Sequence, residues 1–210
     1  MLYAYHLIED QQRELNGVNV AFVRPVGFYS NLYANLPTIK AAHAIYSNIP
    51  ATVVRRWVAP QDIAAVVLNL LQHVPAGKPV HYVYSDAFSA DQFIEALQKT
   101  LSMPDLHFVS ITDNQAEQAM VANGAPKELA ELFTQMSKLE RTPEKLYADL
   151  TSDQTTIGKV KLAEFAKTFA TAYQNQGDHH SHTLIDRWLK PSLIKLINLT
   201  TSIDTNMRLR

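Results

Sequence analysis

The sequence predicts an α/β fold whose sheet is largely parallel, followed by a smaller, mostly helical lobe. Short apolar runs alternate with amphipathic helical patterns from residue 4 to residue 111, and after residue 113 only helical patterns follow. The run over residues 18–23 is almost continuously apolar, which is typical of a parallel strand covered on both faces. These patterns divide the chain into a sheet-containing part over 1–112, a helical lobe over 113–175, and a linker with an apolar helical tail over 176–210.

The first elements are delimited by glycine and proline. A helix over residues 4–15 ends at Gly17, because glycine tolerates the left-handed conformation at a helix C-terminus. The strand over residues 18–23 follows. Residues 28–40 are expected to continue as helical turns that Pro37 breaks.

The clearest helix of the sequence begins at Pro60. Proline in the first helical position lacks only an N–H group that would have no partner there. Asp62 lies near the positive end of the helix dipole, and this favourable interaction alone explains an acidic residue in the first turn. An apolar stripe should pack on the sheet, and it consists of Ile63, Val66, Val67, Leu70 and Leu71.

The remaining elements continue the alternation and then end it. Ser89 is expected to cap the helix that follows it, and the inward-facing residues of that helix are Phe93, Ile94 and Leu97. The expected strands span residues 52–58, 79–84 and 106–111, and the expected helices span 89–101, 113–123 (stopped by Gly124), 126–140 and 160–174.

Composition excludes several classes of protein. The chain has 210 residues, of which 47% are apolar, enough for one core or for one core with a small lobe. Nineteen Lys and Arg residues nearly balance twenty Asp and Glu residues, so we expect neither nucleic acid nor a membrane as a partner. The absence of cysteine excludes disulfides and thiolate ligands and favours the reducing cytoplasm. The apolar run over residues 2–8 is too short for a signal sequence.

Four stretches, in this order, resemble segments of the NmrA-like proteins, a family of atypical short-chain dehydrogenases/reductases. They are residues 19–25 with 27–32, residues 58–64, residues 108–115 with 124–126, and residues 158–166, and the resemblance spans residues 4–174. It implies a partial Rossmann-like (doubly wound) sheet, an NAD(P) cofactor and an oxidoreductase-type function. The residues that it implies for cofactor binding are Pro25, Val26, Gly27 and Phe28, and those that it implies for the substrate are Tyr29, Asn31 and Leu32.

Two features of the family are missing from this sequence. None of the six glycines lies close enough to another to form the glycine-rich turn that holds a pyrophosphate. We therefore expect the chain to correspond to the C-terminal portion of the family and to bind a dinucleotide weakly or not at all by itself. An unpaired sheet edge should then meet a second copy or a complementing polypeptide. The Tyr-x-x-x-Lys pair is also missing, since Glu9 follows Tyr5 and a carboxylate raises a phenol pKa, so we assign no catalytic residue.

Several alternatives remain open at this point. The chain could belong to an oxidoreductase, to a non-catalytic regulator that senses redox state through a protein partner, or to a truncated remnant without activity of its own. Arg55 and Arg56 before Trp57 could clamp a phosphate, although two arginines before a strand are more typical of a solvated rim. A histidine cluster could bind a metal but is more typical of a polar linker, and we assign no metal site; the cluster comprises His179, His180 and His182.

Overall fold

The computed structural model describes residues 2–150 and 153–175. The predicted linker, the apolar tail and the histidine cluster all lie outside these residues. Within them the chain is a mixed α/β structure with parallel strands and covering helices, which confirms the predicted fold class.

The central sheet contains three parallel strands in the order β1-β5-β8. These are β1 (Phe22–Pro25), β5 (Val80–Tyr84) and β8 (Thr155–Ile157), with Phe22 opposite Val80 and Tyr82 opposite Thr155. The predicted strand over residues 18–23 is thus parallel, but it is shifted towards the C-terminus. The backbone before it is already bound to the neighbouring segment, since the Val20 N–H donates to the Gly77 carbonyl at 2.9 Å.

Two smaller sheets extend the architecture. β4 (Arg55–Val58) pairs in parallel with β2 (Gly27–Phe28) and antiparallel with β6 (Asp86–Phe88). β3 (Ala44–Ser47) pairs in parallel with β7 (His107–Ser110). The sequence analysis did not predict β2, β3, β6 or β8.

The helices begin where the sequence carries start signals. The Ser89 hydroxyl accepts the Gln92 N–H at 3.3 Å and the Gln92 side chain accepts the Ser89 N–H at 2.9 Å, so the predicted cap is confirmed. Pro37 does not break a helix, because it lies in the first turn of a new one. The helices are α1 (Leu2–Glu14), the 3-10 helix η1 (Tyr29–Asn35), α2 (Leu36–Ala42), α3 (Pro60–Gln72), α4 (Ala90–Leu101), α5 (Asp113–Ala122), α6 (Lys127–Glu140), α7 (Pro143–Leu146) and α8 (Leu162–Asn175).

Helix α3 packs on the sheet through a narrower stripe than predicted. Val66 is buried against Val58 and Val83, and Ile63 and Leu70 pack beside this cluster. The prediction was wrong for the other two positions, since Val67 is 37% exposed and Leu71 is 70% exposed. A single sheet covers less than half of a helix circumference, so the apolar residues beyond that arc face outward.

The main core is aromatic and joins distant parts of the sequence. The Tyr29 and Phe165 rings stack with centroids 4.5 Å apart, and Phe93 meets Phe169 edge to face at 5.4 Å. The predicted inward residues of α4 are all buried in this core. Helix α8 therefore packs against α4 on the sheet-containing part, and the described helical lobe consists of α5, α6 and α7.

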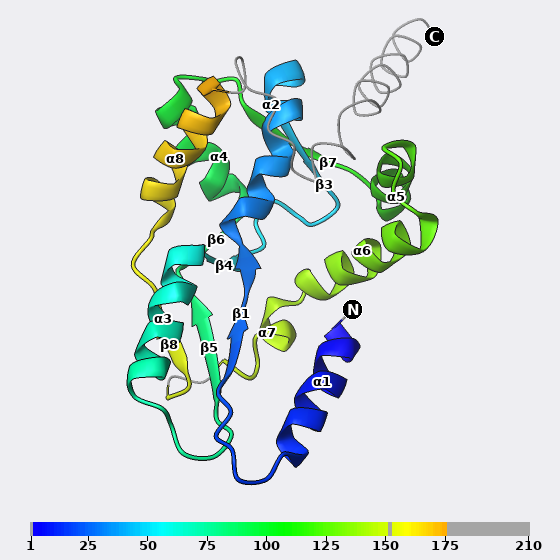
Figure 1. Ribbon diagram of the computed structural model, residues 1–210. Coiled ribbons are helices and arrows are strands. Elements are labelled where there is room, and N and C mark those ends of the chain that lie inside the picture. Colours follow the sequence, from blue (N-terminus) through cyan, green and yellow to red (C-terminus); the bar gives the residue numbers. More distant parts are fainter. Residues whose placement is uncertain (1, 151–152, 176–210) are drawn as a thin grey trace, which may run out of the picture.

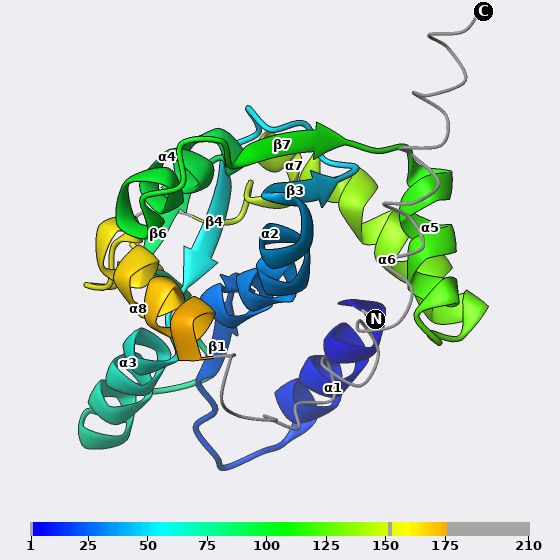
Figure 2. The same cartoon turned by 90° about the horizontal axis from the view of Figure 1, so that it is seen from above.

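The spatial arrangement separates three groups of helices (Figure 1). Helices α4 and α8 lie on one side of α2 and β3, and α5 and α6 lie on the other side, as the view from above also shows (Figure 2). Helix α1 stands apart, next to β1 and on the side away from β5. None of the described helices is both long enough and apolar enough to cross a membrane.

Candidate functional site

A cavity of about 610 Å³ lies between the β2-β4-β6 sheet, η1, α4 and the helical lobe. Its walls are mostly apolar and include aromatic rings from the sheet and from α6. Its principal lining residues are Gly27, Asn31, Leu32, Asn35, Tyr46, Arg55, Trp57, Phe88, Phe93, Met120, Leu129, Phe133, Met136, Ser137 and Glu140. A cavity of this size and character is suited to a small organic molecule with few polar groups.

Gly27 forms part of the wall beside Trp57. A Cβ atom at this position would lie 3.4 Å from Cε3 of the Trp57 indole, which is an ordinary van der Waals contact, so Gly27 lies directly beside the ring. Gly27 and Trp57 are also direct partners in the β2–β4 ladder. This wall is therefore backbone and a flat aromatic ring.

Three of the residues predicted for cofactor or substrate lie together on this cavity. Gly27, Asn31 and Leu32 all line it, and they come from β2 and from the first half of η1. The same turn thus brings a predicted cofactor position next to predicted substrate positions.

The other predicted residues are not among those that line the cavity. Tyr29 is only 2% exposed and donates its hydroxyl hydrogen to the Val160 carbonyl at 3.1 Å. Burial raises the pKa of the Tyr29 phenol well above its ordinary value, so this group stays protonated at neutral pH. Val26 packs beside the buried cluster under α3, and Pro25 and Phe28 are exposed where β1 and β2 end.

Arg55 is a cavity residue that the sequence analysis interpreted as part of a solvated rim. That interpretation was wrong: Arg55 lies within β4, and its side chain is only 18% exposed. Its guanidinium lies 4.5 Å from the centre of the Trp57 ring and donates to Glu140 of α6 at 2.7 Å. The charge pattern alone could not reveal Glu140, which follows 85 residues later.

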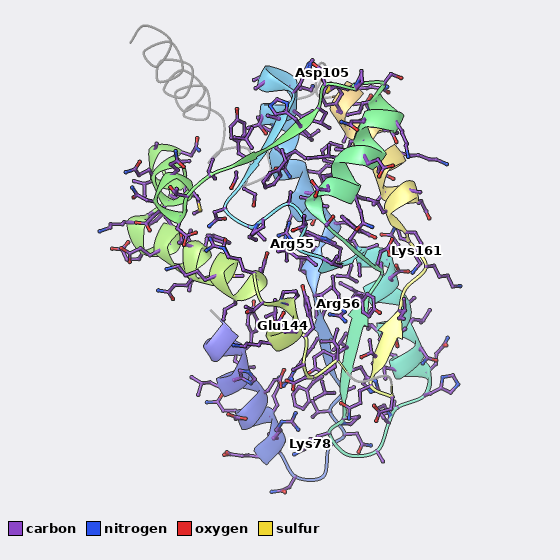
Figure 3. The ribbon with its side chains drawn as sticks, turned by 180° about the vertical axis from the view of Figure 1, so that it is seen from behind. Arg55, Arg56, Lys78, Asp105, Glu144 and Lys161 are labelled. Atoms are coloured by element: carbon purple, nitrogen blue, oxygen red, sulfur yellow. The ribbon has the colours of Figure 1, made fainter. Side chains whose placement is uncertain are left out.

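Arg56 points to the opposite face of the same strand. Its guanidinium lies 4.6 Å from the Tyr147 ring centre and 5.5 Å from the Tyr84 ring centre. Successive residues of a strand alternate between its two faces, so the two adjacent arginines contact different groups of residues. Figure 3 shows both in the middle of the molecule, between the helical lobe and the strands.

The helical lobe is fixed to the sheet-containing part by a second polar cluster. Arg141 donates to the Asn48 carbonyl at 3.0 Å and forms an ion pair with Asp113, and Asn48 donates to Asp113 at 2.9 Å. The hydrogen bond from Arg141, followed by that from Asn48, lowers the pKa of the Asp113 carboxyl. These contacts and the Arg55–Glu140 pair hold the two walls of the cavity together.

Asp62 has a structural role that the helix dipole alone does not explain. Its carboxylate accepts hydrogen bonds from the Ser85 hydroxyl at 2.6 Å and from the N–H groups of Lys159 and Val160 at 3.0 and 3.1 Å. Burial opposes the charged form, but these hydrogen bonds outweigh it and lower the pKa of Asp62. At Gly158 a Cβ atom would lie 2.3 Å from the Asp62 Oδ2 atom, so the segment before α8 comes very close to this carboxylate.

A second cavity of about 290 Å³ continues the first towards α2 and β3. The two share Asn35, Tyr46, Met120 and Ser137 in their walls. The two cavities thus lie next to each other at the boundary between the sheet-containing part and the helical lobe.

No family model matches this sequence. Among curated proteins, it is 30% identical over 168 residues to an NAD(P)H azoreductase of Xenophilus azovorans, a match that covers 78% of this chain and 57% of the azoreductase. The chain thus spans little more than half the length of that relative.

Solved structures with similar folds are less similar in sequence. A nucleoside-diphosphate-sugar epimerase of Staphylococcus aureus superposes with a TM-score of 0.59 at 15% identity, over 79% of this chain and 56% of the epimerase. An L-threonine dehydrogenase of Phytophthora infestans gives a TM-score of 0.52 at 11% identity, over 81% of this chain and 53% of the dehydrogenase. With the parallel strands and their helical connections, these likenesses show that the chain has a Rossmann-like α/β fold.

Proposed function

We propose that this chain forms the substrate-side part of an NAD(P)(H)-dependent oxidoreductase of the NmrA-like kind. The observation that carries the proposal is the aromatic-lined cavity of about 610 Å³ beside the segment that follows β1 and contains β2 and the start of η1. In open α/β folds, ligands bind outside the carboxyl ends of the strands, which is where this turn lies. The similarity to an NAD(P)H azoreductase supports the same reaction class.

The residues of this chain fit one end of such a cofactor. Gly27 and the Trp57 ring form one wall of the cavity, which suits a flat nicotinamide ring, and Pro25, Val26 and Phe28 are neighbours of Gly27 in the sequence. The pyrophosphate would need a glycine-rich turn, which residues 1–210 do not contain. When bound, the cofactor supplies the hydride.

The protein's own contribution is to orient the substrate and to exclude water. Phe133, which is 42% exposed, provides a surface for an aromatic ring, Trp57 and Phe88 belong to the apolar wall, and Asn31 provides an amide. Tyr29 packs against Phe88 in the aromatic core, and its hydroxyl donates to the Val160 carbonyl, so we propose no proton-transfer role for it. We therefore propose planar aromatic compounds, azo compounds among them, as the substrate class.

The proposal is tested by calorimetric titration with azobenzene-4-carboxamide, a flat and neutral probe. We expect micromolar binding, and we expect Gly27→Val to weaken it at least tenfold because the added methyl groups occupy the cavity. Ala87→Val, at an exposed position on β6, is the matched control and should bind the probe as the wild type does. NADPH titrated alone should bind weakly or not at all. The proposal fails if the probe does not bind at millimolar concentration or if Gly27→Val leaves its affinity unchanged.

We also propose that the free edge of β1 takes a further strand. Among the described elements, β1 pairs with a strand only on the β5 side, and helix α1 lies next to its other edge, so a further strand would have to move that helix aside. The N–H groups of Val20, Phe22 and Val26 donate to that side, so by alternation Ala21 and Val23 face the open edge. A complementing polypeptide or a second copy could pair there, and a second copy is favoured because two identical edges pair about a twofold axis without any other component.

A further inference from the structure

We propose that Arg55 determines the specificity of the cavity by selecting aromatic substrates that carry an anionic group, and that Glu140 occupies the place of that group when the substrate is absent. This inference rests on the proposed function and adds the charge of the substrate to it. It follows from three observations: the position of Arg55, the weak attachment of Glu140 and the apolar character of the remaining wall.

Arg55 is held in place from within the sheet. It lies on a strand that is paired on both sides, and its guanidinium lies 4.5 Å from the centre of the Trp57 ring, which is itself only 6% exposed. Stacking on an indole orients a guanidinium and leaves its N–H donors free to bind in the ring plane. Among the described residues that line the cavity, Arg55 and Glu140 are the only charged ones.

Glu140 is attached less firmly than Arg55. It is the last residue of α6, its side chain is 31% exposed, and its hydrogen bond in the described structure is to Arg55. A carboxylate at a helix end can turn into solvent at little cost. Displacing Arg55 instead would break its stacking on Trp57 and leave a partly buried cation unpaired.

Because Arg55 is held more firmly than Glu140, the cavity favours a ligand of negative charge. An anionic ligand can replace Glu140, keep Arg55 neutralised and release the glutamate to water. A cationic ligand would have to replace Arg55, which the strand and the indole hold. Planar carboxylates suit the guanidinium best, because they accept two parallel hydrogen bonds from it.

The ring of such a ligand would occupy the apolar remainder of the cavity. Phe88 of β6 and Phe93 of α4 line it from the sheet-containing part, and Phe133 and Met136 of α6 line it from the helical lobe. A flat aromatic body with one acidic group at the Arg55 end therefore matches both the shape and the charge of the cavity.

The test compares azobenzene-4-carboxylate with azobenzene-4-carboxamide, two probes that differ only in charge. We expect the wild type to bind the carboxylate roughly tenfold more tightly than the carboxamide. Arg55→Gln should abolish this preference while the carboxamide affinity stays within about threefold, and Arg55→Lys should give an intermediate preference because lysine keeps only the charge. Glu140→Gln should increase the carboxylate affinity by roughly threefold or more, since it removes the competing anion.

Arg56→Gln is the matched control, because it removes the neighbouring arginine from the opposite face of β4. It should leave the preference intact in protein that circular dichroism shows to be folded. Equal affinities of the wild type for the two probes, or a preference that survives in both Arg55 variants, would overturn the inference and leave the proposed function standing. Failure of both probes to bind would instead contradict the proposed function.

Discussion

Asp62 joins two parts of the molecule through a single buried carboxylate. Ser85 comes from the end of the central sheet, and the Lys159 and Val160 amides come from the segment that leads into α8. A charged acceptor makes stronger hydrogen bonds to such donors than a neutral one. Asp62 thus fixes the point at which α8 leaves the sheet.

Asp62→Asn is expected to destabilise the protein by about 2 kcal/mol at neutral pH, because an amide cannot accept all three hydrogen bonds. For a chain of this size the loss corresponds to a fall of roughly 4–8 °C in the thermal midpoint. Circular dichroism melting curves measure it. Asp91→Asn, at an exposed position in the first turn of α4, is the control and should change the midpoint much less.

The pH dependence of this difference tests its cause. The pKa of Asp62 is lower in the folded than in the unfolded protein, so its contribution is complete above the unfolded value of about 4 and is lost as pH falls through the folded value. The difference in midpoint between wild type and Asp62→Asn should therefore shrink below about pH 4. A difference that is the same at every pH would show that lost packing, and not the charge, is responsible.

At the scale of elements, α1 is fastened by two side-chain clusters: one around Glu9 and Arg24, and one in which the Lys78 ammonium donates to the carbonyls of Arg13 and Leu15. Arg24 of β1 donates to Glu9 at 2.9 Å through Nε and to the Tyr82 hydroxyl at 2.8 Å, while Arg13 lies over the Phe22 ring at 4.6 Å. The hydrogen bond from the Arg24 guanidinium lowers the pKa of the Glu9 carboxyl, although its partial burial opposes this. The Lys78 contacts lie at the C-terminal end of α1, whereas Glu9 lies further towards its N-terminus, and the helix stands apart from the other helices in Figure 2.

Glu9→Ala is therefore expected to release α1 without unfolding the core. Amide hydrogen exchange over residues 2–14 should accelerate at least roughly tenfold, and the thermal midpoint should change by less than about 3 °C, because local opening costs less than global unfolding. Asp10→Ala removes the adjacent, exposed carboxylate and should leave the exchange rates as they are. Unchanged exchange in Glu9→Ala would mean that apolar packing holds the helix.

The elements that the sequence predicted are those with local signals. Ser89 and Gln92 cap α4 whatever lies around them, and Pro60 starts α3 in the same way. β3 and β8 have no such signals, since they consist of four and three residues and are strands only because β7 and β5 lie beside them. Their pairing is decided by tertiary structure, which a local pattern does not contain.

The residues of the candidate site also divide into those with local sequence signals and those that depend on tertiary contacts. Gly27, Asn31 and Leu32 lie together on the cavity because they belong to one short segment, and their roles in binding cofactor and substrate stay predictions. Arg55 was interpreted as a rim residue because its partner Glu140 is remote in the sequence. Tyr29 was predicted to contact the substrate, but its side chain is buried in the aromatic core. The sequence of a short turn does not show which of its side chains face the core.

At the scale of the whole molecule, the open edge of β1 predicts association. Sedimentation equilibrium should show a concentration-dependent dimer, and Ala21→Pro should abolish it, because proline removes an N–H group that faces the open edge. Val20→Pro is the matched comparison: it removes an N–H group that donates to Gly77 and should lower stability instead. A wild-type chain that stays monomeric at every concentration would contradict pairing with a second copy.

The aromatic core has a consequence for the order in which the chain can fold. Its closing contacts join Tyr29 to Val160, 131 residues apart, and Asp62 to Lys159, 97 residues apart. During synthesis, β1, η1 and α4 leave the ribosome while the rings that complete their core, Phe165 and Phe169, are still to come. Contacts of such long sequence separation form slowly. The apolar faces of these early elements must therefore remain exposed until α8 arrives, and that interval is the stage at which this protein is most prone to aggregate.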